Sequence, residues 1–329
     1  MQSENRVDIV GGFTIDAIIR ADGTWSTGQL GGNALWACMG AGVLAEGTPV
    51  AHAVVGADYS AADLESIAAR GIDVSGVRRA HAARNARVTF AYRADGSRAQ
   101  PAPAGAIAVL PDAVRPEFAD TTRDPALTLA SLPTAADLAT APGSRWHLGL
   151  LPAVRFAELV TALRQTGAAD IQVDCPARFE LRRDGEAVLR EHLSQVDVFL
   201  PSSSDTDVFA PGVAHRDLVT RFHEYGAPVV VMKRGAEGAL VSDARSGEAW
   251  SVPAYPVGEH LDATGAGDVF CGTFATARAA GRDLLTAAVE ASAYATYALD
   301  AASPLDLKTP DTRELSQRIA RVREGVTPL

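Results

Sequence analysis

The sequence predicts an α/β fold in which helices cover both faces of a mainly parallel central sheet and a small separate β sheet forms a lid. Two patterns support this prediction. Between residues 146 and 232, short apolar runs alternate with segments of helical periodicity. In the first third of the chain, residues alternate in polarity around turn signals. The chain has 329 residues, 47% of them hydrophobic, so it can bury a large core, and we interpret residues 1–329 as a single domain.

The lid is expected from two segments that leave the main sheet early in the chain. One surrounds the turn signal at residues 21–23, and the other surrounds residues 94–97. They predict short antiparallel strands within residues 13–30 and 87–102. The Pro- and Ala-rich stretch 99–111 is expected to return the chain from the lid.

The central sheet is expected from strands that alternate with amphipathic helices. Strands separated in this way run parallel through right-handed crossovers, and the helices cover both faces of the sheet. The expected strands are residues 7–10, 146–150, 171–174, 196–200 and 228–232, and the expected helices are residues 153–165, 185–194 and 215–225.

Composition argues against several classes of function. The net charge is −10 and basic residues are not clustered, so neither nucleic acid nor a membrane surface is an expected partner. The first strand follows no signal-like leader and no apolar run is long enough to span a membrane, which predicts a cytoplasmic protein. Cys38, Cys175 and Cys271 lack the spacing of a zinc site or disulfide framework, and we expect them to be small buried hydrophobes.

Several common nucleotide-binding motifs are missing from the sequence. The only lysines, Lys233 and Lys308, do not follow the glycine pattern of a P-loop, and the protein-kinase motifs are absent. No G-x-G-x-x-G occurs, and the seven histidines show no metal-binding spacing. Any phosphate chemistry would therefore depend on backbone amides, arginine and Mg²⁺.

The most informative segment is Asp262-Ala263-Thr264-Gly265-Ala266-Gly267-Asp268, which leads into an apolar helix. The small residues Gly265, Ala266 and Gly267 let a ligand approach helix N–H groups that have no intrahelical partner, as phosphate binding requires. The carboxylate of Asp268 would lie beside that phosphate and could take a proton from an attacking hydroxyl. The alternative is that Asp268 only caps the helix.

A second group of residues is placed to hold a polyhydroxylated ligand. Gly31, Gly32 and Asn33 end the first lid segment, where the glycines could flex and the asparagine could hydrogen-bond to hydroxyls. Asp16 follows the first strand and could accept hydrogen bonds from two adjacent hydroxyls. The alternative for Asn33 is an ordinary helix N-cap after a glycine turn.

Together these motifs resemble those of the ribokinase-like (PfkB) family of carbohydrate kinases, and the resemblance runs over nearly the whole chain. It implies a three-layer α/β/α sandwich that binds ATP and Mg²⁺ and phosphorylates a hydroxyl of a sugar. Asp268 would be the general base, and the amides of residues 265–268 would form the anion hole. Asp16 and Asn33 would hold the sugar, together with the glycine pair Gly31 and Gly32 at the lid. In many members the lid also makes the dimer contact, so a homodimer is expected.

The resemblance also assigns a nucleotide and metal region. Residues 233–238 match the family's glycine turn beneath the nucleotide, which implies roles for Lys233, Gly235 and Gly238; an ordinary β-turn is the alternative. Where the family has N-x-x-E, this chain has Ser202 to Asp205, which keeps oxygen ligands for Mg²⁺ but has a shorter carboxylate that would act through water.

A cation site and the acceptor are less strongly indicated. Asp262 and Thr264 resemble the donors of a monovalent-cation (K⁺) site, with a plain tight turn as the alternative. Tyr92 and Arg93, and a segment ending at Arg178, resemble parts of 2-keto-3-deoxygluconate kinases, and an arginine would suit a sugar acid. These arginines could instead be surface charges. The low aromatic content, 6%, and the lack of an aromatic cluster near residues 31–33 weigh against a nucleoside kinase. A catalytically weak, sugar-binding pseudokinase is the further alternative.

Overall fold

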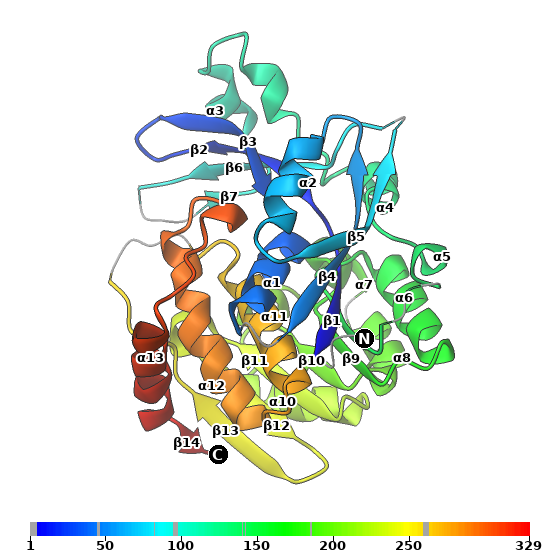
Figure 1. The fold of residues 1–329 in the computed structure, drawn as a ribbon, viewed down its shortest axis with the longest axis vertical. Helices are drawn as coiled ribbons and strands as arrows, with labels where there is room; N and C mark the ends of the chain where they lie inside the picture. Colours follow the sequence, from blue (N-terminus) through cyan, green and yellow to red (C-terminus); the bar gives the residue numbers. More distant parts are fainter. Residues whose placement is uncertain are drawn as a thin grey trace.

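In the computed structural model, a large mainly parallel sheet forms the centre of the molecule (Figure 1). The structure describes residues 5–44, 47–81, 83–94, 98–139, 141, 143–184, 186–258 and 263–329. The sheet has ten strands in the order β14-β13-β12-β11-β10-β9-β8-β1-β4-β5, and the pairs from β5 to β11 are parallel. The strands are β1 (Arg6–Val10), β4 (Thr48–Gly56), β5 (Asp73–Ala80), β8 (Arg145–Leu148), β9 (Asp170–Asp174), β10 (Val198–Leu200), β11 (Val229–Lys233), β12 (Ala239–Asp243), β13 (Glu248–Val252) and β14 (Thr327–Pro328).

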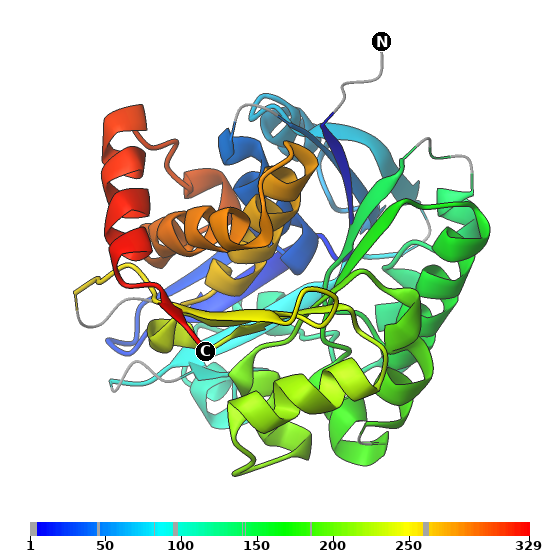
Figure 2. The same cartoon turned by 90° about the horizontal axis from the view of Figure 1, so that it is seen from below.

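Helices cover both faces of this sheet, as Figure 2 shows from below. Strand β11 illustrates why the sequence folds this way: Val229 and Val231 pack into one core and Val230 and Met232 into another, on opposite faces. The predicted α/β fold is therefore confirmed. One layer contains α1 (Asn33–Ala41), α2 (Ala61–Ala68), α11 (Ala266–Ala279), α12 (Leu284–Ala295) and α13 (Thr312–Glu324), and the other contains α6 (Ala153–Gln165), α7 (Arg178–Asp184), α8 (Ala187–His192) and α10 (His215–Glu224).

The predicted lid is present as a separate four-stranded sheet in the order β3-β2-β6-β7. Its strands are β2 (Thr14–Ile19), β3 (Trp25–Gly31), β6 (Arg87–Tyr92) and β7 (Arg98–Ala99). The expectation of purely antiparallel strands is wrong in one respect, because β2 and β6 pair in parallel. Between these two strands the chain passes through β3, α1, β4, α2 and β5, which supplies the long connection that parallel pairing requires.

The outer face of the lid is covered by a segment of the same chain. Ala17, Ile19 and Ala91 on the lid pack against Leu110 and Phe118. These partners belong to the region of α3 (Ala104–Ala108) and η2 (Arg115–Phe118), which lies beyond the lid in Figure 1. The Pro- and Ala-rich stretch therefore does more than return the chain, since it buries the apolar side of the lid.

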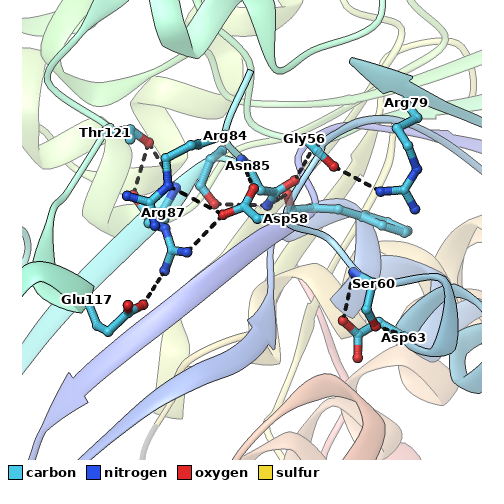
Figure 3. Close-up of polar contacts among 12 residues, drawn as sticks. Gly56, Asp58, Ser60, Asp63, Arg79, Arg84, Asn85, Arg87, Glu117 and Thr121 are labelled. Atoms are coloured by element: carbon cyan, nitrogen blue, oxygen red, sulfur yellow. Dashed lines mark hydrogen bonds and ion pairs between the residues drawn. The ribbon is translucent and has the colours of Figure 1, made fainter. Parts of the chain in front are cut away.

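A buried polar joint connects the lid to the end of β4 (Figure 3). The side chain of Asn85 accepts a hydrogen bond from Gly56 N–H (2.9 Å) and donates one to the Phe13 carbonyl (3.0 Å). The guanidinium of Arg87, at the start of β6, contacts Asp58 (2.9 Å) and Glu117 (3.0 Å). Because these contacts join loop, lid and covering segment, they fix where the lid begins relative to the main sheet.

Candidate active site

Helix α11 begins with a backbone geometry that only glycine adopts without strain. Gly265 is the N-cap, with φ of 79°, and a Cβ at this position would collide with the indole of Trp36. The N–H of Ala266 donates to the Ala263 carbonyl (3.3 Å), and the first helical bond runs from Val269 N–H to Gly265 (2.8 Å). Within the described ranges, the N–H groups of the two intervening residues, 267 and 268, have no hydrogen-bond acceptor. They are available for an anion.

Asp268 lies in the first turn of this helix with a strongly altered acidity. Burial, and then the charge of Asp174, raise the pKa of Asp268 to about 7, while Lys233 and Arg98 act in the opposite direction. A carboxylate with a pKa near neutrality can accept a proton from a hydroxyl more readily than an ordinary aspartate can.

A buried ion pair lies beneath the start of α11. The ammonium group of Lys233 contacts Asp174 (2.9 Å) and the Cys271 sulfur (3.1 Å), and it lies close to Gly267. Burial disfavours the charge of Lys233, but the charge of Asp174 and the neighbouring Cys271 and Asp268 outweigh it and raise the pKa of Lys233. Lys233 was assigned to the nucleotide turn by resemblance; its side chain instead points under the anion cradle. Cys271 is buried as predicted, with a polar partner that the sequence did not indicate.

Asp16 lies on the side of the lid sheet that faces the core. Its side chain is only 8% exposed, accepts a hydrogen bond from the Thr14 hydroxyl (2.6 Å) and lies against Gly31, where a Cβ would collide with the carboxylate. Burial raises the pKa of Asp16 to about 7, against the effects of the Thr14 hydroxyl and Arg98. Gly31 thus provides the space that Asp16 occupies.

Asn33 connects three segments near this carboxylate. Its Oδ1 accepts from the N–H groups of Gly12 (2.8 Å) and Ala34 (2.9 Å), and its Nδ2 donates to the Leu150 carbonyl (2.9 Å). The N-cap of α1 is Gly32, with φ of 106°, and Asn33 is the first helical residue. The alternative of an asparagine N-cap is therefore wrong. Among the described residues, Asn33 Nδ2 donates only the hydrogen bond to the Leu150 carbonyl, so its second amide hydrogen is available.

A narrow cleft joins Asp16 to the segment that begins α11. Its walls come from the lid, from α1, from Thr264 and from the stretch after α12. The lining residues are Asp16, Ile18, Gln29, Leu30, Trp36, Phe90, Tyr92, Thr264, Ala301, Ala302, Ser303 and Pro304. Asp16 and the segment that begins α11 thus open onto one space.

The cleft corrects one expectation about aromatic residues. Trp36, Phe90 and Tyr92 all line it, so an aromatic cluster does lie close to residues 31–33 in space. Trp36 is one helical turn after Asn33, and Phe90 and Tyr92 alternate along β6 toward the same face. These spacings are visible in the sequence, but they indicate an aromatic cluster only once the packing of the lid against α1 is known.

Other predicted residues are placed as follows. Tyr92 lines the cleft, and its hydroxyl contacts the Thr264 hydroxyl (3.0 Å). Arg93 is exposed and is not part of the cleft lining. Arg178 begins α7, but its side chain lies outside the described residues, as does Asp262 of the predicted cation site. Arg98, which no sequence pattern indicated, contacts Thr264 from the lid.

The glycine turn after β11 has the compact geometry expected of it. Gly238 has φ of 85°, and a Cβ there would collide with the Val252 carbonyl. The Arg234 N–H donates to the Gly238 carbonyl (2.7 Å), and the Gly238 N–H donates to Gly235 (3.0 Å). The turn therefore presents backbone rather than side chains at this edge of the sheet.

Ser202 and Asp205 form a capping box at the start of α9 (Ser203–Phe209). One carboxylate oxygen of Asp205 accepts from the Ser202 hydroxyl (2.5 Å) and N–H (3.2 Å). The charge of Asp205 also raises the pKa of Asp174 and Asp268, so the three carboxylates share one region. Within the described part of the chain, no three acidic, histidine or cysteine side chains form a ready metal site.

We expect Asp205→Ala to raise the Mg²⁺ concentration needed for half-maximal rate, because it removes a carboxylate that is expected to contact Mg²⁺ through water. Asp205→Glu should be tolerated, since Asp205 occupies the N3 position of the capping box, where glutamate is common. Initial rates across a Mg²⁺ titration measure both effects. Asp207→Asn, on the exposed side of the same helix, is the control. An unchanged Mg²⁺ dependence in Asp205→Ala would show that other groups hold the metal.

Within the described ranges, no helix combines the length and hydrophobicity needed to cross a bilayer.

Comparisons with known proteins find similarity to several kinases. A cytidine kinase of Thermococcus kodakarensis is 29% identical over 140 residues, which cover 42% of this chain and 49%, about half, of that kinase. A Burkholderia thailandensis nucleoside kinase in complex with inosine superposes with a TM-score of 0.71 at 16% identity, covering 96% of each chain. An E. coli protein described as a ribokinase II, with ATP and Mg²⁺ bound, gives 0.70 at 20% identity over 96% of this chain and 99% of that one.

The two structures establish a ribokinase-like fold, as the sequence motifs predicted. Residues 149–308, which contain the buried ion pair, the capping box and the start of α11, match the family model named pfkB family carbohydrate kinase. This part of the chain is therefore similar to the PfkB family of carbohydrate kinases.

Proposed function

We propose that this protein transfers the γ-phosphoryl group of ATP to a hydroxyl of a small polyhydroxylated acceptor. The observation that carries the proposal is the position of Asp268, whose pKa is raised to about 7, beside two available N–H groups at the start of α11. Thr264 of the same segment and Asp16 line one cleft. A base, an anion cradle and an acceptor site are the parts that phosphoryl transfer requires.

In the proposed mechanism, Asp16 and Asn33 orient the acceptor, and Asp268 takes the proton from the attacking hydroxyl. The amides of Gly267 and Asp268 and the dipole of α11 stabilise negative charge on the phosphoryl oxygens. Mg²⁺, bound with ATP, would neutralise phosphate charge near Asp205. The lid excludes water, which would otherwise compete with the acceptor.

The primary candidate acceptor is a sugar or sugar acid. A nucleoside is the second candidate, and the aromatic lining by Trp36, Phe90 and Tyr92 favours it, because aromatic rings stack on bases. The similarity to the cytidine kinase of T. kodakarensis supports the same candidate.

ADP formation with ATP and Mg²⁺ tests the proposal across a panel of ribose, fructose, 2-keto-3-deoxygluconate, cytidine and inosine. We expect one acceptor class to stimulate ADP formation and Asp268→Asn to abolish the stimulation. Acceptor-dependent thermal stabilisation with no ADP formation from any member of the panel would instead identify a sugar-binding pseudokinase.

We expect Asp16→Asn to raise KM for the acceptor roughly tenfold to a hundredfold, the range for losing hydrogen bonds to a charged group, with little change in KM for ATP. The same variant should be more stable than wild type at pH 8. The folded-state pKa of Asp16 is about 7, above its ordinary value, so wild-type stability falls as pH rises through 7 and this carboxyl ionises while buried.

Steady-state kinetics and thermal unfolding at pH 6 and pH 8 measure these effects. Asp22→Asn, which changes an exposed carboxylate in the turn of the same lid hairpin, is the control. An equal loss of ATP and acceptor affinity in Asp16→Asn would contradict the division between the two binding sites.

Two further predictions concern assembly and monovalent ions. A homodimer through the lid stays a prediction, and sedimentation velocity tests it. Such a dimer would have to form around the segment that already covers Ala17, Ile19 and Ala91. A K⁺ requirement near Thr264 also stays a prediction, tested by rates in K⁺ and Na⁺ at equal ionic strength.

A further inference from the structure

Arg98 carries a positive charge from the lid to the catalytic segment. It lies on β7 directly opposite Tyr92 of β6, so both side chains leave the same face of the lid sheet. Their polar ends meet at one atom, the hydroxyl oxygen of Thr264, which is 166 residues away from Arg98 in the chain. Thr264 immediately precedes the N-cap of α11.

The guanidinium has a defined position over an aromatic ring. Its central carbon lies 4.9 Å from the centre of the Phe90 ring, and Phe90 itself lines the cleft. The side chain is therefore held between the cleft wall and the start of α11, although Arg98 is exposed on its outer side.

The charge of Arg98 acts on both functional carboxylates. It lowers the pKa of Asp16 and the pKa of Asp268, in each case against the larger effect of burial. A single cation, held by its contacts with Thr264 and the Phe90 ring, therefore favours the ionised form of both carboxylates. In the proposed reaction, the phosphoryl group passes between these two carboxylates.

We propose that Arg98 is a catalytic residue that the lid delivers to the transferring phosphoryl group. This inference rests on the proposed function. The bond from the acceptor oxygen to Pγ forms as the bond from Pγ to the β,γ-bridging oxygen breaks, the proton goes to Asp268, and ADP leaves. In this step Arg98 exchanges its contact with Thr264 for the equatorial phosphoryl oxygens, which it can bind through two N–H groups at once.

The inference also explains how catalysis depends on lid closure. The chain has no P-loop lysine, and Lys233 is buried in its pair with Asp174. Arg98 is on the lid side of the cleft, in a strand of two residues. Its charge reaches the phosphoryl group only when the lid covers the acceptor, so ATP hydrolysis without an acceptor would lack this stabilisation.

The test compares Arg98→Ala, Arg98→Lys and Tyr92→Phe with a control, Arg20→Ala, which changes an exposed arginine that directly follows β2 of the lid. We expect Arg98→Ala to lower kcat by on the order of 10³, near the lower end of the effect of an arginine finger, with a small change in KM for ATP. Arg98→Lys should recover part of the loss. Tyr92→Phe removes the other contact with Thr264 without changing charge and should cost less than about tenfold.

A second measurement uses ADP, Mg²⁺ and aluminium fluoride, which together mimic the transferring phosphoryl group. In the presence of the acceptor, wild type and Arg20→Ala should bind ADP more tightly when aluminium fluoride is added, and Arg98→Ala should lose that gain. Circular dichroism and thermal unfolding establish that each variant is folded.

Two outcomes would overturn the role of Arg98. One is a kcat for Arg98→Ala within about threefold of wild type with a raised acceptor KM, which would assign Arg98 to acceptor binding. The other is an equal loss in Tyr92→Phe, which would reduce Arg98 to a lid contact. Either result leaves the proposed function intact if Asp268→Asn is inactive. A third outcome would refute the proposed function alone. In it, wild type forms no ADP with any acceptor but binds ADP more tightly with aluminium fluoride, and Arg98→Ala loses that gain.

Discussion

Asp268→Asn should lower kcat by on the order of 10² to 10⁴, the range for losing a general base, while the affinity for ATP stays near the wild-type value. Asparagine keeps the size of the side chain but cannot take the hydroxyl proton. The N–H groups at the start of α11 remain in place, because Gly265 and its packing against Trp36 set the backbone there. Asp268→Asn should therefore bind ATP normally while it loses catalytic rate.

The matched control is Asp217→Asn. Asp217 is the third residue of α10, the position that Asp268 has in α11, and it is exposed. A helix-capping role predicts similar small losses of stability in the two variants and no specific loss of kcat. Rates, calorimetric ATP binding and thermal unfolding measure the difference. A normal kcat in Asp268→Asn would remove this carboxylate from the mechanism.

The raised pKa of Asp268 also predicts how the reaction rate changes with pH. The proposed base works only when deprotonated, so kcat/KM for the acceptor should rise as pH increases through the pKa of Asp268, about 7 in the unliganded protein. The pH at which the rate rises is therefore expected well above the ordinary pKa range of an aspartate, because burial and the charge of Asp174 disfavour ionisation of Asp268.

The parts of the fold that the sequence predicted are those with local signals. The strands of the main sheet are buried on both faces, so they read as short apolar runs between amphipathic helices. The segment from Gly265 to Asp268 is contiguous, and so its cradle and carboxylate could be recognised together. The lid was located because its hairpin turn at residues 21–23 is also a local signal.

The features that the sequence did not indicate all depend on distant contacts. The pairing of Lys233 with Asp174 spans 59 residues, and the contact of Arg98 with Thr264 spans 166. The aromatic lining combines α1 with the lid, and the parallel pairing of β2 with β6 depends on the path of the chain between them. The periodicity of a sequence does not indicate which distant segments contact each other in the fold.

Lys233→Met should lower the free energy of unfolding by about 3–5 kcal/mol at neutral pH, the cost of leaving a buried charge without its partner. Lys233 and Asp174 are 8% and 6% exposed, so water cannot replace the lost contact at Asp174. The double variant Lys233→Met/Asp174→Leu should recover much of the loss, because it removes the unpaired charge as well. Urea unfolding of the two single variants and the double variant measures the coupling. Additive losses in the double variant would contradict a buried ion pair.

The pH dependence of the same variant tests the pair in a second way. Without Lys233, burial raises the folded-state pKa of Asp174 further above its unfolded value, so the folded protein takes up a proton at this carboxyl. A raised folded-state pKa gives stability that is present at low pH and lost as pH rises, and the destabilisation of Lys233→Met should therefore shrink on acidification. Lys233 also lowers the pKa of Asp268, so its loss should move the rise of kcat/KM with pH to higher pH. If Lys233→Met is less stable but its rate rises at the same pH as in wild type, the ion pair stabilises the packing of α11 and does not set the pKa of Asp268.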